Sequence, residues 1–420
     1  MRGGRDANRL RIVSHQRNPI VVSDFTATTA VGRGREALLD ALHARRGALR
    51  ACEFGPPELA QFGRLHRLET YVGEVAGLDA VELPAHLASF DCRNNRLAWL
   101  GLHQDDFLAE AVRVREQYGA DRVAVIFGTS TSGMLQAEWA YHVRAGAGPL
   151  PGSFNYAKTL NSYSVAAFVA EVLGLNGPSY VVSTACSSSA KVFAAAARLM
   201  YAGVVDAAVV GGVDSLCLTT LYGFGSLELL SPAPCRPFAA DRSGISIGEG
   251  AGFALLEYAD QAPQALARLA GWGESSDAHH MSSPHPEGLG AQLAMRGALE
   301  RARLKPEQIG YINLHGTATR ANDVAEGRAV AAVFGPEVPG SSTKAWFGHL
   351  LGAAGIAEVA VSLLALNQNF APGTLNTEEK DPACPNWLLT DNVGTQLDYV
   401  LSNSFGFGGS NCSLVFGRPS

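Results

Sequence analysis

The segment SYVVSTACSSSAKVF at residues 179–193 decides how this chain is interpreted. Its first part, SYVVSTA, is a β-branched apolar run typical of a strand. The stretch that follows, SSSAKVFAAAARLMYAG, predicts a helix that Gly203 closes. Cys186 therefore lies where a strand gives way to a helix, beside the unpaired N–H groups of the first helical turn.

This position suits a nucleophilic cysteine. The positive end of a helix favours thiolate over thiol and can lower a cysteine pKa from about 8.5 to about 3.5–7.5. The same N–H groups can hold an oxyanion formed when the sulfur attacks a carbonyl carbon. The alternative is a buried structural cysteine, because free cysteine is among the most buried residue types. The polar TACSSS surroundings favour a nucleophile enough to make the two interpretations equally plausible. This segment alone leaves both the nucleophilic and the structural interpretation open.

Length and composition indicate a large α/β protein. The chain has 420 residues, which is comfortable for two fused halves, and 47% of them are hydrophobic whereas 17% are charged. The 46 glycines fit the tight turns and close backbone contacts of α/β enzymes. A formal net charge of −6 gives no basic field for nucleic acid.

Targeting and redox signals point to the cytoplasm. No apolar run reaches the roughly 18 residues that a membrane span needs. The basic N-terminus lacks the apolar core of a signal peptide, so residues 1–18 are expected to form a disordered arm. Seven scattered cysteines without a CxxC pair favour a reducing compartment, with no disulfide framework and no zinc site.

Predicted strands and helices alternate along both halves of the chain. The expected strands lie at 19–27, 121–128, 179–185, 206–216, 250–259, 265–277, 309–319 and within 398–417, and the expected helices at 34–49, 105–119, 160–173, 187–203, 290–304, 323–334 and 349–366. This alternation predicts buried, parallel-type sheets covered by helices. The succession restarts after about residue 262, which suggests a duplicated architecture with halves at 19–262 and 263–420.

Three later segments carry chemistry at the ends of predicted elements. NLHGTATRAND places His315 at the end of a strand, and SSTKAWFGHLLGAAG places Lys344 and His349 at the entrance of an apolar helix. NSFGFGGSN is a glycine-rich loop that carries Phe405 and Phe407. Each segment alone is ambiguous, because a histidine at a strand end is often structural and a glycine-rich loop is often a turn. Open α/β sheets gather their sites at this edge, so together these segments favour one site.

Taken together, the motifs resemble the elongating β-ketoacyl-acyl carrier protein synthases (KAS I/II type) of the thiolase superfamily, with some features of polyketide ketosynthases. The matching motifs occur in the family's order as TACSSS, CRPFAADRSGISIGEGAG, DAHHMSSPHPEG, HGTAT, STKAWFGHLLGAAG and NSFGFGGSN. The resemblance runs from about residue 19 to the C-terminus. It implies a thiolase-like fold whose two βα halves form α/β/α/β/α layers.

The resemblance also implies a decarboxylative Claisen condensation. Cys186 would take the acyl chain from an acyl carrier protein as a thioester. His315 and His349 would hold the thioester oxygen of malonyl carrier protein while CO2 leaves, and Lys344 would support them. The phosphopantetheine would arrive on the carrier protein, so no separate cofactor and no metal are expected. His279, His280 and His285 lack a rigid ligand spacing.

Further roles follow from the resemblance alone. The backbone N–H groups of Cys186 and Phe407 would form an oxyanion hole, and Glu358 would partner Lys344. The remaining positions serve the gate, the pantetheine arm and the acyl pocket: Phe407, Phe405 and Asp277 at the gate, Thr317 and Thr319 on phosphopantetheine, and Thr131 and Phe224 in the acyl pocket.

The chain departs from the family pattern at a few positions. Thr131 replaces the glycine or apolar residue that lines the acyl pocket, and the segment 231–236 is short. Within the fatty acid, polyketide or aryl-polyene elongation that the resemblance implies, these features suggest an unusual chain, such as a polyene or aryl-polyene intermediate, rather than a routine saturated fatty acid. Glu228 falls where a basic residue often docks the carrier, which leaves Arg93 and Arg96 as alternative docking residues.

Three other functions remain in view. The first is a chain-length-factor subunit that pairs with a ketosynthase, although such subunits usually lack the cysteine. The second is a cysteine hydrolase, which needs water access to the thiol. The third is a thiolase, which needs a second cysteine, and Cys412 is expected to be core instead. By resemblance the chain is expected to form a homodimer or a heterodimer with a related subunit.

Overall fold

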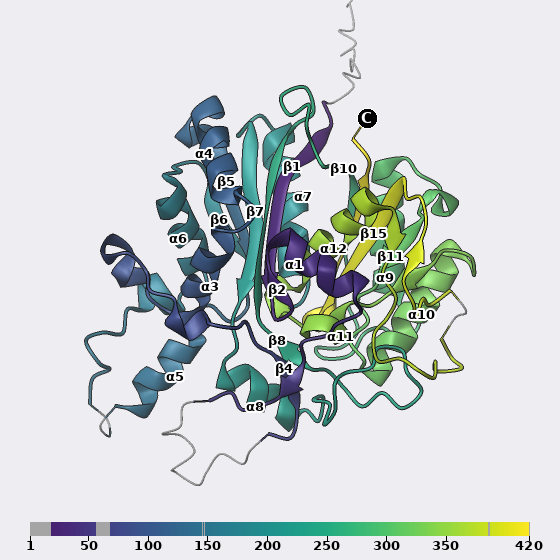
Figure 1. The fold of residues 1–420 in the computed structure, drawn as a ribbon, viewed down its shortest axis with the longest axis horizontal. Helices are drawn as coiled ribbons and strands as arrows, with labels where there is room; N and C mark the ends of the chain where they lie inside the picture. Colours follow the sequence, from purple (N-terminus) through teal and green to yellow (C-terminus); the bar gives the residue numbers. More distant parts are fainter. Residues whose placement is uncertain (1–17, 56–67, 145, 147, 385–386, 420) are drawn as a thin grey trace, which may run out of the picture.

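The computed structural model describes residues 18–55, 68–144, 146, 148–384 and 387–419. Two five-stranded halves lie side by side, with the N-terminal half at the left of Figure 1 and the C-terminal half at the right. They meet where β1 pairs with β10 through Val21–Arg268 and Val22–Ala267. The predicted α/β fold class is confirmed.

The N-terminal half of the sheet has the order β6-β5-β7-β9-β1. Its strands are β1 (Ile20–Thr29), β5 (Val123–Gly128), β6 (Ser179–Val182), β7 (Ala207–Asp214) and β9 (Gly250–Tyr258), with β2 (Gly32–Arg33) paired to β1. β5 runs parallel to both β6 and β7, so the carboxyl ends of these three strands meet at one edge.

The C-terminal half has the order β10-β16-β15-β11-β12. Its strands are β10 (Ala267–Ser276), β11 (Tyr311–Asn313), β12 (Gly340–Ser341), β15 (Tyr399–Gly406) and β16 (Ser410–Gly417). β11 is parallel to β12 and β15, which brings the segments after these strands to the same edge. Two small sheets add β3 (Arg50–Ala51), β4 (Tyr71–Gly73) and β8 (Ile247–Gly248), and β13 (Phe370–Ala371) with β14 (Val393–Gly394).

Two helices form the layer between the halves. α7 (Ser188–Tyr201) and α12 (Ala354–Gln368) contact each other and strands of both halves. Small side chains allow this close approach, since a Cβ on Gly355 of α12 would come within 2.6 Å of the Ala190 nitrogen of α7. Both helices follow segments that carry predicted site residues.

The outer helices cover the exposed faces of the two halves and complete the α/β/α/β/α layers (Figure 1). On the N-terminal half these are α3 (Arg93–Leu102), α4 (Phe107–Tyr118) and α6 (Ser164–Leu173), and on the C-terminal half α9 (Leu289–Ala302) and α10 (Arg320–Phe334). The remaining helices are α1 (Gly34–His43), α5 (Met134–His142), α8 (Leu218–Ser226) and α11 (Lys344–Phe347).

Several boundaries differ from the sequence predictions. The apolar helix expected from residue 349 begins as a 3-10 turn at Leu351–Ala353 and becomes α12 at Ala354. α3 lies in the region 45–105, which shows no clear periodicity in sequence. The predicted N-terminal arm at 1–18 falls almost wholly outside the described residues. The division of the chain at residue 262 stays a prediction.

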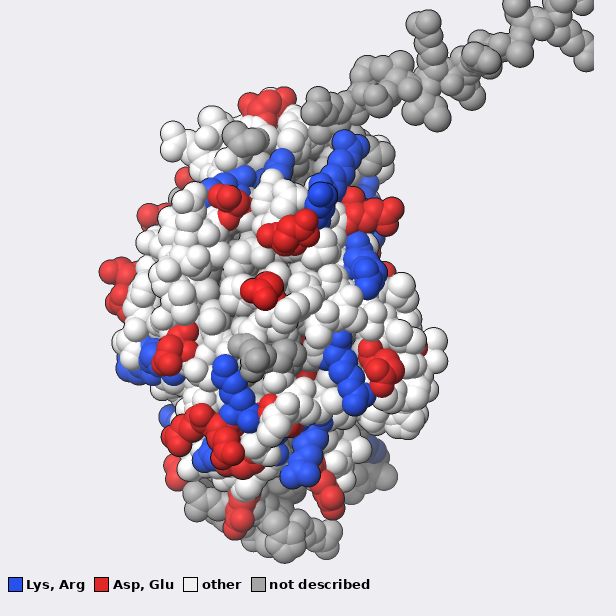
Figure 2. Space-filling model, turned by 90° about the vertical axis from the view of Figure 1, so that its right-hand side faces the viewer, with Lys and Arg blue, Asp and Glu red and all other residues white. Residues whose placement is uncertain are grey.

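One helical stretch in the described part of the chain, Leu351–Gln368, is long and apolar enough to cross a membrane. The fold buries 89% of it, so its apolar character reflects a core helix. The surface of the molecule carries charges of both signs. Figure 2 shows Lys and Arg interspersed with Asp and Glu on one face rather than gathered into a field of one sign.

Candidate active site

Cys186 sits on a sharp turn between β6 and α7. Ala185, just before it, has a left-handed φ of 52°, a backbone conformation that costs a non-glycine residue about 1–3 kcal/mol. The Ser188 hydroxyl holds this turn, because it accepts from the Thr184 N–H at 2.9 Å and donates to the Ala185 carbonyl at 2.6 Å. The turn directs the thiol into a cavity of about 570 Å³.

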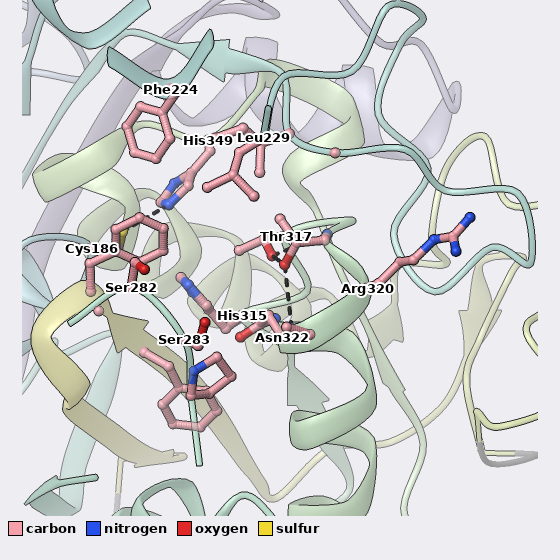
Figure 3. A pocket seen from close by; sticks show the side chains of 18 of the residues that line it. Cys186, Phe224, Leu229, Ser282, Ser283, His315, Thr317, Arg320, Asn322 and His349 are labelled. Carbon is pink, nitrogen blue, oxygen red and sulfur yellow. Dashed lines mark hydrogen bonds between the residues drawn. The ribbon is translucent and has the colours of Figure 1, made fainter. Parts of the chain in front are cut away.

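Two histidines from the other half of the chain face the same cavity. His349 Nε2 lies 3.0 Å from the Cys186 sulfur. The His315 and His349 rings are 5.5 Å apart and nearly perpendicular, at 84°. Figure 3 shows both rings turned toward the space beside Cys186. The structure thus brings together three residues that are separated by up to 163 positions in sequence.

Lys344 fixes the protonation of one ring. Its side chain is 1% exposed, and its ammonium is hydrogen-bonded to the His315 carbonyl and to Glu358, with His315 Nδ1 at 3.3 Å. An ammonium can only donate, so Nδ1 accepts and the other nitrogen of the neutral ring carries the proton. His315 therefore offers an N–H donor.

His349 is held differently. Its buried Nδ1 has no hydrogen-bond partner among the described residues. The protein thus leaves the tautomer of this ring open, and Nε2 can either accept a proton from the thiol or carry one.

Burial dominates the titration of the pair. It lowers the pKa of both His315 and His349 well below 6.5, and Lys344 adds to the effect, so both rings are neutral near pH 7. The helix-terminus prediction of an acidic Cys186 thiol is wrong. Burial raises the pKa of Cys186 to about 11, against the opposing effects of Lys344 and the Phe407 N–H. The thiol must lose its proton to a base, and His349 Nε2 is in contact with it.

We expect this protonated resting state to be visible in alkylation kinetics. Without substrate, the rate of Cys186 alkylation by iodoacetamide should rise about tenfold per pH unit between pH 7 and 9, because the thiolate fraction follows a high pKa. Peptide-resolved mass spectrometry reports Cys186 separately from the half-exposed Cys384. A plateau at or below pH 8 would show an acidic thiol instead.

The glycine-rich loop reaches Cys186 from β15. The N–H groups of Phe407 and of Cys186 itself point toward the sulfur and lower the thiol pKa slightly. A Cβ at Gly406 would meet the Thr184 carbonyl at 2.7 Å, so only glycine permits this approach. Two N–H groups so placed can stabilise the oxyanion that forms when the sulfur attacks a carbonyl carbon.

The gate residues form one connected layer. The Gly408 N–H donates to the Met281 carbonyl at 2.7 Å, and the Asp277 N–H donates to the Gly409 carbonyl at 2.9 Å. Asp277 also accepts from the Asn411 amide at 2.9 Å. These bonds tie the 277–285 loop to the Phe407 loop, so displacement of one displaces the other.

Aromatic side chains line the entrance. Phe224 and Phe407 pack with their centroids 5.7 Å apart, and Phe405 lies 5.9 Å from the His315 ring. All three line the cavity, as do Thr317 and Thr319, whose hydroxyls are hydrogen-bonded to each other at 2.9 Å.

Two sequence-based assignments meet a different environment. Thr131 is 2% exposed and is not among the residues that line this cavity, because its hydroxyl is bonded to Asp214 at 2.8 Å. Arg93 is unsuitable for docking, since it is buried and paired with Glu249. Arg96 is paired with Asp91.

Sequence reasoning missed two residues that hold the histidine segment. Glu326 accepts from the His315 and Gly316 N–H groups at 2.8 and 2.7 Å, and Asn403 donates to it at 3.3 Å. Burial raises the pKa of Glu326 to about 7. The signal was available, because Glu326 shares the apolar face of its helix with Ala329, Val330 and Val333.

Cys186, His315 and His349 also resemble a metal-ligand cluster, with one ligand-type atom of each within 4.8 Å of the others. Lys344 argues for a different use, because it leaves a proton on the second nitrogen of His315. The arrangement suits hydrogen bonding to an oxygen that gains negative charge.

Comparison with known proteins agrees with this geometry. The N-terminal domain of the beta-ketoacyl synthases matches residues 96–262, and their C-terminal domain matches residues 266–378. The chain belongs to the β-ketoacyl synthase family. The 3-oxoacyl-[acyl-carrier-protein] synthase 2 of Vibrio cholerae is 32% identical over 88% of the chain and 94% of its own length.

Solved β-ketoacyl synthases share the whole fold. A chain from the complex of the ketosynthase ApeO with its chain length factor ApeC, from Xenorhabdus doucetiae, is 36% identical, with a TM-score of 0.84 over 96% of this chain and 99% of that one. A beta-ketoacyl synthase from Burkholderia phymatum is 28% identical, with a TM-score of 0.83 over 96% of this chain and 99% of that one. The thiolase-like prediction is confirmed.

Proposed function

We propose that the protein is a β-ketoacyl-acyl carrier protein synthase that condenses a Cys186-bound acyl group with malonyl carrier protein. The observation that carries this proposal is the contact of the Cys186 sulfur with His349 Nε2 in a chamber shared with a second, proton-bearing imidazole. One thiol can hold the acyl group while two N–H donors act on the other substrate.

The first step is transfer of the acyl group. His349 accepts the thiol proton, and the sulfur attacks the carbonyl carbon of the incoming thioester. The N–H groups of Cys186 and Phe407 stabilise the oxyanion. The carrier's pantetheine thiolate leaves and takes the proton back from His349, which restores the neutral ring.

The second step is loss of CO2 from malonyl carrier protein. The bond between the carboxylate carbon and the α-carbon breaks, and its electron pair moves into an enolate. His315 stabilises the enolate oxygen together with His349 in the tautomer that carries its proton on Nε2. Lys344 keeps the His315 proton on the nitrogen that faces this oxygen. Neutral imidazoles suit this step, because they donate without repelling a cationic neighbour.

Carbon–carbon bond formation completes the cycle. The enolate carbon attacks the Cys186 thioester, the oxyanion forms between the same two N–H groups, and the cysteine thiolate leaves. One proton from solvent then restores the Cys186 thiol. Thr317 and Thr319, at the cavity wall, contact the phosphopantetheine arm. The gate around Phe407 opens for this arm and closes behind it.

The site favours a catalytic subunit over the alternatives. A chain-length-factor role does not need a thiol in contact with a buried imidazole, whereas this chain retains Cys186, both histidines and Lys344. A cysteine hydrolase needs water at the acyl-enzyme, and Cys186 is only 6% exposed. A thiolase needs a second reactive thiol, and Cys412 is fully buried in β16.

The N-terminal half of the chain offers a surface for a partner subunit. β6 ends the strand order and has no neighbour on its outer side among the described strands. α5 and the adjoining 156–160 turn expose Trp139 at 41%, Tyr141 at 59% and Tyr156 at 61%. An unpaired edge and exposed aromatic side chains support a homodimer or a heterodimer with a related subunit. The proposal includes action in the cytoplasm on polyene intermediates, for which the short segment 231–236 is the remaining support.

Purified protein should be incubated with malonyl carrier protein and a panel of acyl carrier proteins, alone and with a co-expressed related subunit. We expect a β-ketoacyl product two carbons longer than the primer and one equivalent of CO2. Equal turnover of saturated and polyunsaturated primers would remove the polyene assignment. If free fatty acid were the main product, the protein would be a hydrolase and the proposed synthase function would be wrong.

A further inference from the structure

Asp214 is a fully buried carboxylate at the end of β7. It accepts hydrogen bonds from three consecutive residues of the turn after β5. It also accepts one from Gly352, in the segment that follows His349. The donors are the Thr129 hydroxyl at 2.6 Å, the Ser130 N–H at 2.9 Å and hydroxyl at 2.6 Å, the Thr131 N–H and hydroxyl at 2.8 Å, and the Gly352 N–H at 2.6 Å.

These bonds join the end of the N-terminal half of the sheet to the segment that carries His349. Gly352 follows His349 by three residues, and Leu351 between them has a left-handed φ of 54°. A Cβ at Gly352 would lie 2.7 Å from the Asp214 carboxylate, so glycine is required for this contact. The strained turn is thus fixed from outside by Asp214.

His349 is anchored on both sides. The first anchor is the backbone of His349 itself: its N–H donates to the Ser246 carbonyl at 2.7 Å, and its carbonyl accepts from the Gly248 N–H at 3.0 Å. After the ring, the contact between Gly352 and Asp214 sets the course of the chain. Removal of the second anchor frees the turn without removing any group that touches substrate.

The donors around Asp214 make the carboxylate hard to replace. Among the described residues, no Lys, Arg or His donates to it, so neutral N–H and O–H groups supply its stabilisation. Backbone N–H groups reach both oxygens. An asparagine must therefore point its own NH2 at a backbone N–H, whichever way its amide is turned.

We propose that Asp214 is a positioning residue for condensation, which sets the place of the His349 ring relative to Cys186. This inference rests on the proposed function. It predicts that loss of Asp214 slows chemistry and leaves binding of the malonyl carrier intact, because the cavity wall at Thr317 and Thr319 belongs to a different segment. A purely structural carboxylate would instead lower the folded fraction and leave each folded molecule fully active.

The test compares Asp214→Asn with a matched control, Glu257→Gln. Glu257 is also fully buried and accepts from Arg113 at 2.8 Å and from Tyr118 at 3.0 Å. It lies on β9, near the end of that strand that is distant from Asp214. For each variant the acylable Cys186 fraction is titrated by mass spectrometry. The kcat per acylable site and the KM for malonyl carrier protein are then measured.

We expect Asp214→Asn to lower kcat per acylable site about 10- to 100-fold with KM within about threefold, because a small misplacement of a catalytic group has this effect. Glu257→Gln should keep the wild-type kcat per site. Equal kcat per site in Asp214→Asn and wild type, or an equal loss in both variants, would overturn the inference.

A second variant covers the case in which Asp214→Asn does not fold. Ser130→Ala removes one hydroxyl that donates to Asp214 at 2.6 Å and accepts from Gly352 at 3.1 Å. A loss of about three- to tenfold in kcat per site is expected, and an unchanged kcat would count against the positioning role. A wild-type protein that forms neither acyl adduct nor CO2 would overturn the proposed function itself.

Discussion

Cys186→Ala is expected to abolish condensation, with a loss on the order of 10⁴-fold or more, because no other group can hold the acyl chain. Release of CO2 from malonyl carrier protein should continue, since His315, His349 and Lys344 remain. The measurement is a paired assay of β-ketoacyl product and CO2 in the same reaction.

The matched control is Cys384→Ser, a half-exposed thiol outside the cavity. It should retain wild-type rates for both products. Substantial condensation by Cys186→Ala would mean that another residue accepts the acyl chain, and the assignment of the nucleophile would be wrong.

His315→Ala should separate the two halves of the reaction. Its N–H donor faces the position of the enolate oxygen, and loss of one such donor lowers a rate by about 10²–10³-fold. Acylation of Cys186 should proceed, because His349 rather than His315 contacts the sulfur. Acyl adduct and CO2 are measured on the same sample.

His349→Ala should impair both steps, because this ring contacts the sulfur and also faces the enolate. His86→Ala serves as the control, since it removes an exposed imidazole from the turn at Ala85–Phe90, outside the cavity, and leaves the buried rings in place. Parallel losses of acylation and decarboxylation in His315→Ala would contradict the division of roles.

Local sequence patterns predicted the junction at Cys186 and the strand ends that carry His315 and Phe407. Each of these depends on a short stretch in which an apolar run meets small polar residues. The alternation of strands and helices predicted the α/β class, whereas the layers followed from the family resemblance. The expectation of parallel-type sheets was wrong for part of the sheet, because β1 and β10 each pair antiparallel with their neighbours. The sheet-edge argument placed Cys186 and His349 in one site, but their direct contact came only with the structure, because spacing along the chain does not encode it.

The errors have physical causes that a sequence hides. The thiol pKa was expected to fall because a helix terminus is visible in sequence, whereas burial, which raises it to about 11, depends on the tertiary fold. Thr131 was expected to line the acyl pocket, but its hydroxyl donates to Asp214, because a buried carboxylate requires hydrogen-bond donors. Arg93 looked like a surface charge, yet it pairs with Glu249 from a segment 156 residues away.

Mass spectrometry of the peptide that contains Cys186, taken after brief exposure to acyl carrier protein without malonyl carrier, tests the central claim most directly. The account predicts a stoichiometric acyl thioester on Cys186 that persists until malonyl carrier protein is added and then disappears as β-ketoacyl product forms. An unmodified Cys186 peptide, or an acyl group that is lost as free acid before malonyl carrier arrives, would contradict it.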